Sequence, residues 1–197
     1  MPFKGHKSVT KHDGSTPDSW TKLTCGHCNT QISGAVVCGL YEQASNVRWI
    51  LCPNCNDGSV LARDRNLYPG VVFGPNIVGL PKDIKAAYDE ARKCMSVNSY
   101  TACELLCRKI LMHIAVEKGA KEGDSFSNYI DFIENKGFIT PPMKKWVTLI
   151  KKHGNKSTHK LETPEKERAE STIMFTAELL RLIYEMEHMS KKYNPVK

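Results

Sequence analysis

The sequence has no apolar run long enough to cross a membrane, and its first twenty residues lack the apolar core of a secretory signal. We therefore expect no membrane association and a cytoplasmic location, where thiols stay reduced. The sequence also lacks a Gly-x-Ser-x-Gly elbow, a phosphate-binding P-loop and a dinucleotide fingerprint. These absences argue against a serine hydrolase of the elbow type, a P-loop nucleotide hydrolase and a Rossmann dehydrogenase.

Low-complexity segments are absent as well, and the composition is that of an ordinary globular protein. The 197 residues are 41% apolar and 25% charged, which is enough to bury a core without help from disulfides. The formal net charge is +7 with every cysteine counted as neutral. Four thiolates on one zinc ion would lower it to about +5. Such a mildly basic balance is compatible with a nucleic-acid partner, and equally with a role in solubility.

Four of the eight cysteines form two Cys-x-x-Cys pairs, Cys25/Cys28 and Cys52/Cys55, with 23 residues between the pairs. Two intervening residues allow a tight turn to direct both sulfurs to one metal ion, and two such turns complete a tetrahedron. The spacing predicts a zinc ribbon that holds one Zn²⁺ per chain. Four thiolate ligands leave no open coordination position, so we expect this zinc to be structural. A redox dithiol is the alternative, which two pairs at ribbon spacing disfavour.

The other cysteines have simpler interpretations. Cys38 lies between the two pairs and is expected on a strand. Cys103 and Cys107 are four residues apart on a predicted helix, so they share one face. A second metal or redox site that includes Cys94 or His113 is one interpretation. Because no complete ligand set is present, burial of these cysteines as small apolar residues explains them better.

The chain divides by composition into four segments. Residues 1–19 are polar and mildly basic, which predicts a flexible arm, with contact to nucleic acid as the alternative. Residues 20–68 contain the cysteine pairs and short β-type runs, and they form the expected zinc ribbon. Residues 69–81 are rich in proline and glycine and predict a linker. Residues 82–193 show helical periodicity throughout.

The helical segment contains five amphipathic patterns. They cover residues 82–97, 99–118, 124–136, 140–154 and 163–192. Thr140-Pro141 and Thr163-Pro164 are helix-start signals, with threonine as N-cap and proline at the first helical position. Gly154 is expected to end the fourth helix. The predicted fold class is therefore mainly α, a five-helix bundle preceded by a small N-terminal β zinc ribbon.

The stretch of residues 150–161 lies between the last two predicted helices and is rich in lysine. Basic side chains contact phosphates, so a nucleic-acid-binding site is one hypothesis for this stretch. The candidate contacts are Lys151, Lys152, Lys156 and Lys160. A structural alternative needs no substrate: Gly154 ends the helix, and Asn155 and His159 form hydrogen bonds across the junction.

Three short motifs in residues 80–193 carry a resemblance to a known family. They are Leu80-Pro81-Lys82-Asp83-Ile84, Cys107-Arg108-Lys109-Ile110-Leu111 and Gly154-Asn155-x-x-x-His159. Together with the long closing helix, they resemble an uncharacterised family of HEPN-like helical domains. Members of this family often follow a zinc ribbon, and some are attached to the motor subunits of restriction enzymes. The resemblance implies a HEPN-like bundle that forms a homodimer, and a role in microbial defence against foreign nucleic acid.

The resemblance also implies a candidate chemistry. Active HEPN ribonucleases carry an arginine, a polar residue and a histidine, and two protomers direct these motifs into one cleft. His159 matches the histidine, a general acid or base for ribose chemistry, and Asn155 matches the polar residue. Gly154 stands where the arginine is expected, and Lys151 or Lys152 is the substitute cation, although lysine is a point charge. Three hypotheses follow: a nucleic-acid-binding or adaptor protein, a metal-independent ribonuclease, and a protein–protein interaction module.

Overall fold

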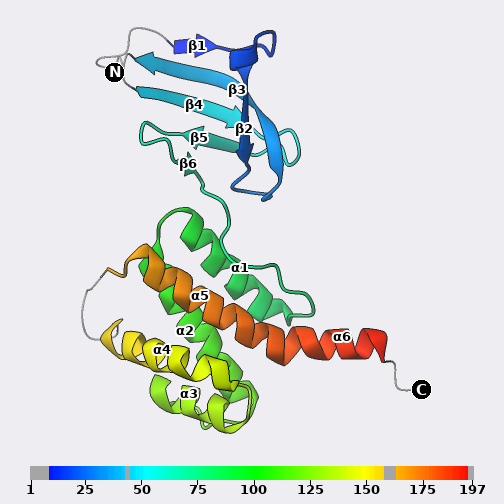
Figure 1. Cartoon of the computed structure of the whole chain (residues 1–197), viewed down its shortest axis with the longest axis vertical. Helices are drawn as coiled ribbons and strands as arrows, with labels where there is room; N and C mark the ends of the chain where they lie inside the picture. The colour runs from blue at the N-terminus through cyan, green and yellow to red at the C-terminus, as the bar shows by residue number, and fades with distance from the viewer. Residues whose placement is uncertain (1–8, 43–44, 158–162, 195–197) are drawn as a thin grey trace. The chain divides into compact units, whose positions relative to one another are not determined.

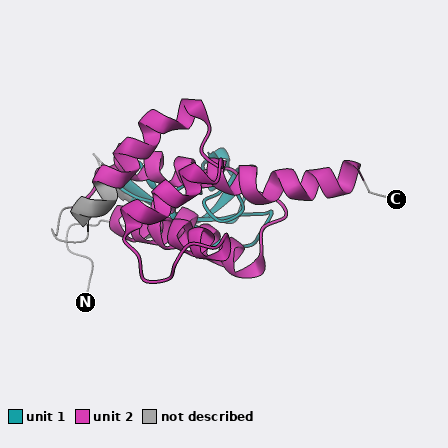
Figure 2. Cartoon of the chain, turned by 90° about the horizontal axis from the view of Figure 1, so that it is seen from below, with its two compact units in different colours: residues 1–72 teal, residues 73–197 magenta. Residues whose placement is uncertain are grey.

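A computed structural model of the chain describes residues 9–42, 45–157 and 163–194 (Figure 1). The chain forms two compact units, residues 1–72 and residues 73–197 (Figure 2). The boundary between them lies inside the segment 69–81 that we predicted as a linker. Within the described residues, no helix is both long and apolar enough to cross a membrane.

The first unit is built on a six-stranded antiparallel sheet. Its strands are β1 (Val9–Lys11), β2 (Trp20–Thr24), β3 (Gln31–Glu42), β4 (Ser45–Leu51), β5 (Gly58–Leu61) and β6 (Leu67–Tyr68). The strand order is β1-β3-β4-β5-β6, and β2 also pairs with β3. A β-bulge interrupts the pairing of β3 with β4 between Val36 and Cys38. The small core of this unit includes Val36, Leu40 and Ile50.

We predicted a flexible arm for residues 1–19, and the part of it that the structure describes contains regular secondary structure. Val9–Lys11 forms β1, and a short 3-10 helix, η1, covers Pro17–Ser19. The physical reason lies in β3, which has 12 residues whereas its neighbour β2 has 5. The backbone groups of β3 beyond the end of β2 need partners, and β1 supplies them by pairing opposite Cys38, Gly39 and Leu40.

The second unit is helical. Its elements are α1 (Lys82–Ser96), α2 (Tyr100–Glu117), α3 (Phe126–Asn135), the 3-10 helix η2 (Pro141–Met143), α4 (Lys144–Ser157), α5 (Lys166–Leu180), the π-helical turn η3 (Arg181–Glu185) and α6 (Met186–Tyr193). Because α5, η3 and α6 follow one another without a break, they form one long helix. The prediction of five helices preceded by a small β unit is therefore confirmed.

The helix α2 lies at the centre of this bundle and packs against α1, α3 and α5. Its buried side chains include Cys103 and Cys107, both fully inaccessible, so the interpretation of these cysteines as core residues is confirmed. Glu104 on α2 is also buried, and Arg168 on α5 binds it in a bidentate manner, with both N–O distances 2.8 Å. Pairing of this kind is what allows a carboxylate to lie in a core.

Two predicted helix ends are wrong. α4 does not end at Gly154 but continues to Ser157, because a glycine lowers helix propensity without stopping the helix unless the backbone turns to positive φ. The last long helix begins at Lys166, with Glu165 as its N-cap, and not directly after Thr163-Pro164. The start at Thr140-Pro141 is confirmed, since Thr140 is the N-cap of η2, which leads into α4.

Candidate metal centre

The two Cys-x-x-Cys segments form turns with the same backbone hydrogen bonds. In the first turn, the N–H of Asn29 donates to the carbonyl of Cys25 at 2.9 Å, and the N–H of Cys25 donates to the carbonyl of Thr30 at 3.0 Å. The second turn repeats both bonds at the same distances, from Asn56 to Cys52 and from Cys52 to Asp57. Each turn therefore directs its two cysteines in the same way.

An asparagine follows the second cysteine of each pair, and both asparagines have a φ of 60°. This left-handed conformation is unfavourable for most residues, but asparagine tolerates it because its short polar side chain bonds locally. Our sequence analysis did not identify Asn29 and Asn56. The signal was present, since both segments read Cys-x-x-Cys-Asn.

Gly26 occupies a position in the first turn where no side chain fits. A Cβ at this position would lie 2.0 Å from the carbonyl oxygen of Pro69 and 2.6 Å from that of Gly70. The chain that follows β6 therefore passes directly over the first turn. Because the obstructing atoms belong to the backbone, a side chain at position 26 could be accommodated only by moving this segment.

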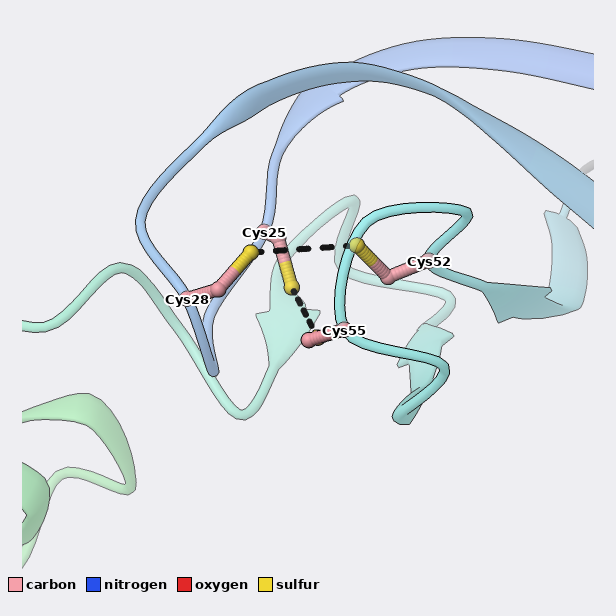
Figure 3. Close-up of side chains that lie close together, drawn as sticks. All are labelled: Cys25, Cys28, Cys52 and Cys55. Atoms are coloured by element: carbon pink, nitrogen blue, oxygen red, sulfur yellow. Dashed lines mark hydrogen bonds between the residues drawn. The ribbon is translucent and has the colours of Figure 1, made fainter.

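The structure brings together the four cysteines that we predicted as metal ligands (Figure 3). The sulfur of Cys25 lies 3.8 Å from that of Cys55, and the sulfur of Cys28 lies 3.8 Å from that of Cys52. All four sulfurs lie within 4.8 Å of one another. A tetrahedral site with metal–sulfur distances of about 2.3 Å has sulfur–sulfur edges of about 3.8 Å. The cluster therefore has the dimensions of a site that could hold one metal ion.

Hydrogen bonds to sulfur support the cluster. The backbone N–H of His27 points to the sulfur of Cys25 at 3.4 Å, and the side-chain amide of Asn54 donates to the sulfur of Cys28 at 3.4 Å. Hydrogen bonds from Thr30 and then from Asn54 lower the pKa of the Cys28 thiol to about 6. Such donors stabilise thiolate, the form in which cysteine binds metals.

The helical unit is the part of the chain that resembles known sequences. A family model described as "Domain of unknown function (DUF4145)" matches residues 89–195, which is more than half of the chain. The chain belongs to the DUF4145 family. The match begins within α1 and contains α2 to α6, so the metal centre lies outside it. No curated protein and no solved structure matches the chain.

The lysine-rich stretch lies inside the DUF4145 match, at the end of α4. Lys151 is mostly buried and forms an ion pair with Asp131 of α3, whereas Lys152 is exposed. Asn155 and Lys156 belong to the last turn of α4. The candidate catalytic residue His159 and the candidate nucleic-acid contact Lys160 lie outside the described residues.

Trp146 is the only tryptophan of the DUF4145 region, and it is part of the bundle core. Its indole N–H donates to the hydroxyl of Ser171 at 2.8 Å. Its ring packs edge-on against Phe175, with the ring centres 5.5 Å apart. Trp146 therefore packs against the core of the bundle.

A second surface, outside the DUF4145 match, was missed by the sequence analysis. Four large apolar side chains of the sheet are exposed, namely Trp20 (44%), Val37 (46%), Trp49 (36%) and Leu51 (38%). The available signal was the alternation along β4, where Ile50 is buried between the exposed Trp49 and Leu51. We had predicted only short β-type runs within residues 20–68, without assigning two faces to any of them.

Proposed function

We propose that the four cysteines bind one structural zinc ion and that the chain binds single-stranded nucleic acid on the exposed face of its sheet. Sulfur-only ligation in a tetrahedron favours zinc over magnesium or calcium, which prefer oxygen. Four protein ligands also fill the coordination sphere, so the metal holds the two turns and leaves catalysis to other groups. Elemental analysis of purified protein should give one zinc per chain, and less than half of that in Cys28→Ser.

The strand register supports the second half of the proposal. Trp20 lies opposite Ala35, which lies opposite Leu51, so these three residues form a row across β2, β3 and β4. Trp49 is two residues from Leu51 on the same strand and therefore shares its face. Val37 lies at the bulge beside this row. We call these five residues the tryptophan face.

Trp20 is held in a fixed orientation on this face. Its indole N–H donates to the carbonyl of Gly14 at 3.2 Å, and Gly14 has a φ of 86°, which brings its backbone close to the ring. The residue is still 44% exposed. An exposed aromatic residue whose indole N–H is already anchored is suited to stacking, because little side-chain entropy is lost on binding.

Positive charge lies on the same side of the sheet. Lys22 is two residues from Trp20 on β2, and Lys11 on β1 lies opposite Cys38, which in turn lies opposite Trp49. Both lysines are exposed. Beyond Trp20, the face continues into a groove of about 460 Å³ that Lys22, Gln31 and Ser33 help to line. Exposed aromatic rings beside lysines, the combination that single-strand-binding surfaces use, are the observation that carries this proposal.

Binding of a fluorescent single-stranded oligonucleotide, measured by anisotropy, tests the proposal. Loss of one stacking ring costs about 1–3 kcal/mol, so Trp20→Ala and Trp49→Ala should each weaken binding about 5- to 150-fold. Leu149→Ala is the control, because Leu149 is an equally exposed apolar residue of the helical unit. Equal affinities of all four proteins, or no binding by the wild type, would refute the proposal.

A protein partner is a second candidate, which Val37 and Leu51 favour, because aliphatic side chains offer nothing to a phosphate. The salt dependence of binding separates the two, since nucleic-acid binding weakens steeply with salt and apolar association does not. The HEPN-like identity of the bundle, the role in defence, the cytoplasmic location and a ribonuclease reaction at His159 stay predictions from the sequence.

A further inference from the structure

The C-terminal part of the long helix carries a stripe of large apolar side chains that are exposed. Leu182, Met186, Met189 and Tyr193 are 38%, 61%, 38% and 66% exposed. Their spacing of four, three and four residues places them on one side of the helix. No residue of α6 is buried, and α6 extends beyond the other helices (Figures 1 and 2). We call these four residues the α6 stripe.

The base of α6 is fixed, so the stripe is presented in a defined direction. A Cβ at Gly79 would lie 2.4 Å from the Cβ of His188, which shows how closely the two segments pack. The backbone N–H of Val78 donates to the carboxylate of Glu185 at 3.0 Å. These contacts hold the first turn of α6 on a side different from the stripe.

The same unit also has a helix side without a neighbouring helix. α2 is rich in apolar residues and carries Lys109 and His113 on its outer surface. It packs against α1, α3 and α5, but a fourth side is open, where Leu105 is 49% exposed. Two grooves flank this side, of about 300 Å³ toward α1 and about 460 Å³ toward α3. Lys109 and His113 form the ridge between them, since both residues line each groove.

We propose that the α6 stripe of one chain docks along the open side of α2 in a second copy of the chain, and that the exchange is reciprocal. α6 has 8 residues and is about 12 Å long, the width of one helix, so it can span a facing α2. When two helices pack, rows of side chains on one helix fit into the grooves beside a row on the other. The two grooves that flank Lys109 and His113 have this arrangement. Two identical contacts related by a two-fold axis close the assembly as a dimer.

The exposed area is sufficient for such a dimer. At about 150–200 Å² per large side chain, the exposed fractions of the stripe amount to about 300–400 Å². If each contact buries a similar area on the groove, two reciprocal contacts bury about 1,200–1,600 Å², which is within the size range of a standard stable interface. A dimer in which the α6 stripes of the two chains pack only against each other would bury about half of that area.

The mass of the full chain in solution, measured by light scattering during gel filtration, tests the interface. The wild type should be a dimer, and Met186→Lys and Leu105→Glu should each be monomeric. Glu187→Gln is the control for the first variant, because it changes the charge by the same amount elsewhere on α6. Leu149→Glu is the control for the second, because Leu149 is also 49% exposed. Circular dichroism should show unchanged helix content in all four.

A mixture of the two monomeric variants identifies the pairing. In a mixed dimer, the intact α6 of the Leu105→Glu chain meets the intact α2 of the Met186→Lys chain, and the new lysine meets the new glutamate. The mixture should therefore form a dimer that neither variant forms alone. A monomeric wild type, a dimeric single variant, or a mixture that stays monomeric would each overturn the proposal.

Discussion

Replacing Gly26 by alanine should destabilise the sheet unit and weaken zinc binding at its four-cysteine cluster. The added Cβ would lie 2.0 Å from the Pro69 carbonyl oxygen, where an ordinary contact requires about 3.4 Å. The obstructing atoms belong to backbone, so the segment at Pro69 and Gly70 must move or the first metal turn must open. Overpacking of this kind costs about 3 kcal/mol, a large part of the stability of a small unit.

Urea unfolding of the zinc-loaded chain measures this cost. With a slope of about 1.5 kcal/mol/M for a unit of this size, a loss of about 3 kcal/mol lowers the midpoint of sheet unfolding by about 2 M. Tryptophan fluorescence follows both units, because Trp20 and Trp49 lie in the sheet unit and Trp146 lies in the helical unit. Far-UV circular dichroism follows the helical unit and therefore separates the two transitions. Zinc transfer to a colorimetric chelator should also be faster in Gly26→Ala than in the wild type.

Gly58→Ala is the matched control in the same sheet. A Cβ at Gly58 meets no atom within 4 Å, so this variant should unfold at the wild-type midpoint or slightly above it. If Gly26→Ala retained zinc and unfolded together with Gly58→Ala, then the close approach of the Pro69 segment to the first turn would be disproved.

Three further predictions concern single side chains. Asn29→Ala should destabilise the sheet unit by about 1 kcal/mol, because its φ of 60° disfavours alanine, and Asn29→Gly should restore the urea midpoint. Glu104→Gln should destabilise the helical unit by about 3 kcal/mol, because Arg168 loses the buried carboxylate that it binds in a bidentate manner; thermal unfolding followed by circular dichroism measures this, and an unchanged midpoint would contradict it. Burial opposes the ionisation of Glu117, but hydrogen bonds from Tyr184, at 2.6 Å, and from Lys118 hold its pKa below the ordinary value. A carboxyl whose pKa is lowered on folding stabilises the fold at pH values above its unfolded-state pKa. This stabilisation is lost as the pH falls through the folded-state pKa. Tyr184→Phe should therefore flatten the decline of stability below about pH 4.5, and a parallel decline in both proteins would exclude this contribution.

The four-cysteine cluster could be predicted from sequence because the geometry of each pair is local. Two residues between Cys25 and Cys28 determine the turn, and the same holds for Cys52 and Cys55. The matching asparagines belong to the same local pattern and could have been identified with it. Gly26 could not, because its role depends on Pro69, which is distant in sequence and reaches the turn only after the sheet has formed.

The extent of the sheet depends on pairing, and this explains why β1 was missed. A three-residue strand has no pattern of its own, and Val9–Lys11 becomes a strand only because β3 extends beyond β2. The tryptophan face was missed for a related reason. The register and the bulge at Val37 decide which side chains share a side of the sheet, and neither can be derived from the alternation within one strand.

For the helices, the sequence predicted that each element exists, but it did not predict which side chains lie on the outer surface of the bundle. We predicted an amphipathic helix over residues 99–118, and the single apolar stripe of such a helix accounts for one packed side. In this sequence the stripe consists of Cys103, Leu106, Ile110 and Ile114. Leu105 lies outside that stripe and is exposed. An apolar residue in such a position belongs to a second side of the helix, which three neighbours within the unit do not cover. Since an isolated exposed leucine is ordinary, the argument for a partner comes from the conjunction of Leu105 with two flanking grooves and an uncovered α6 stripe.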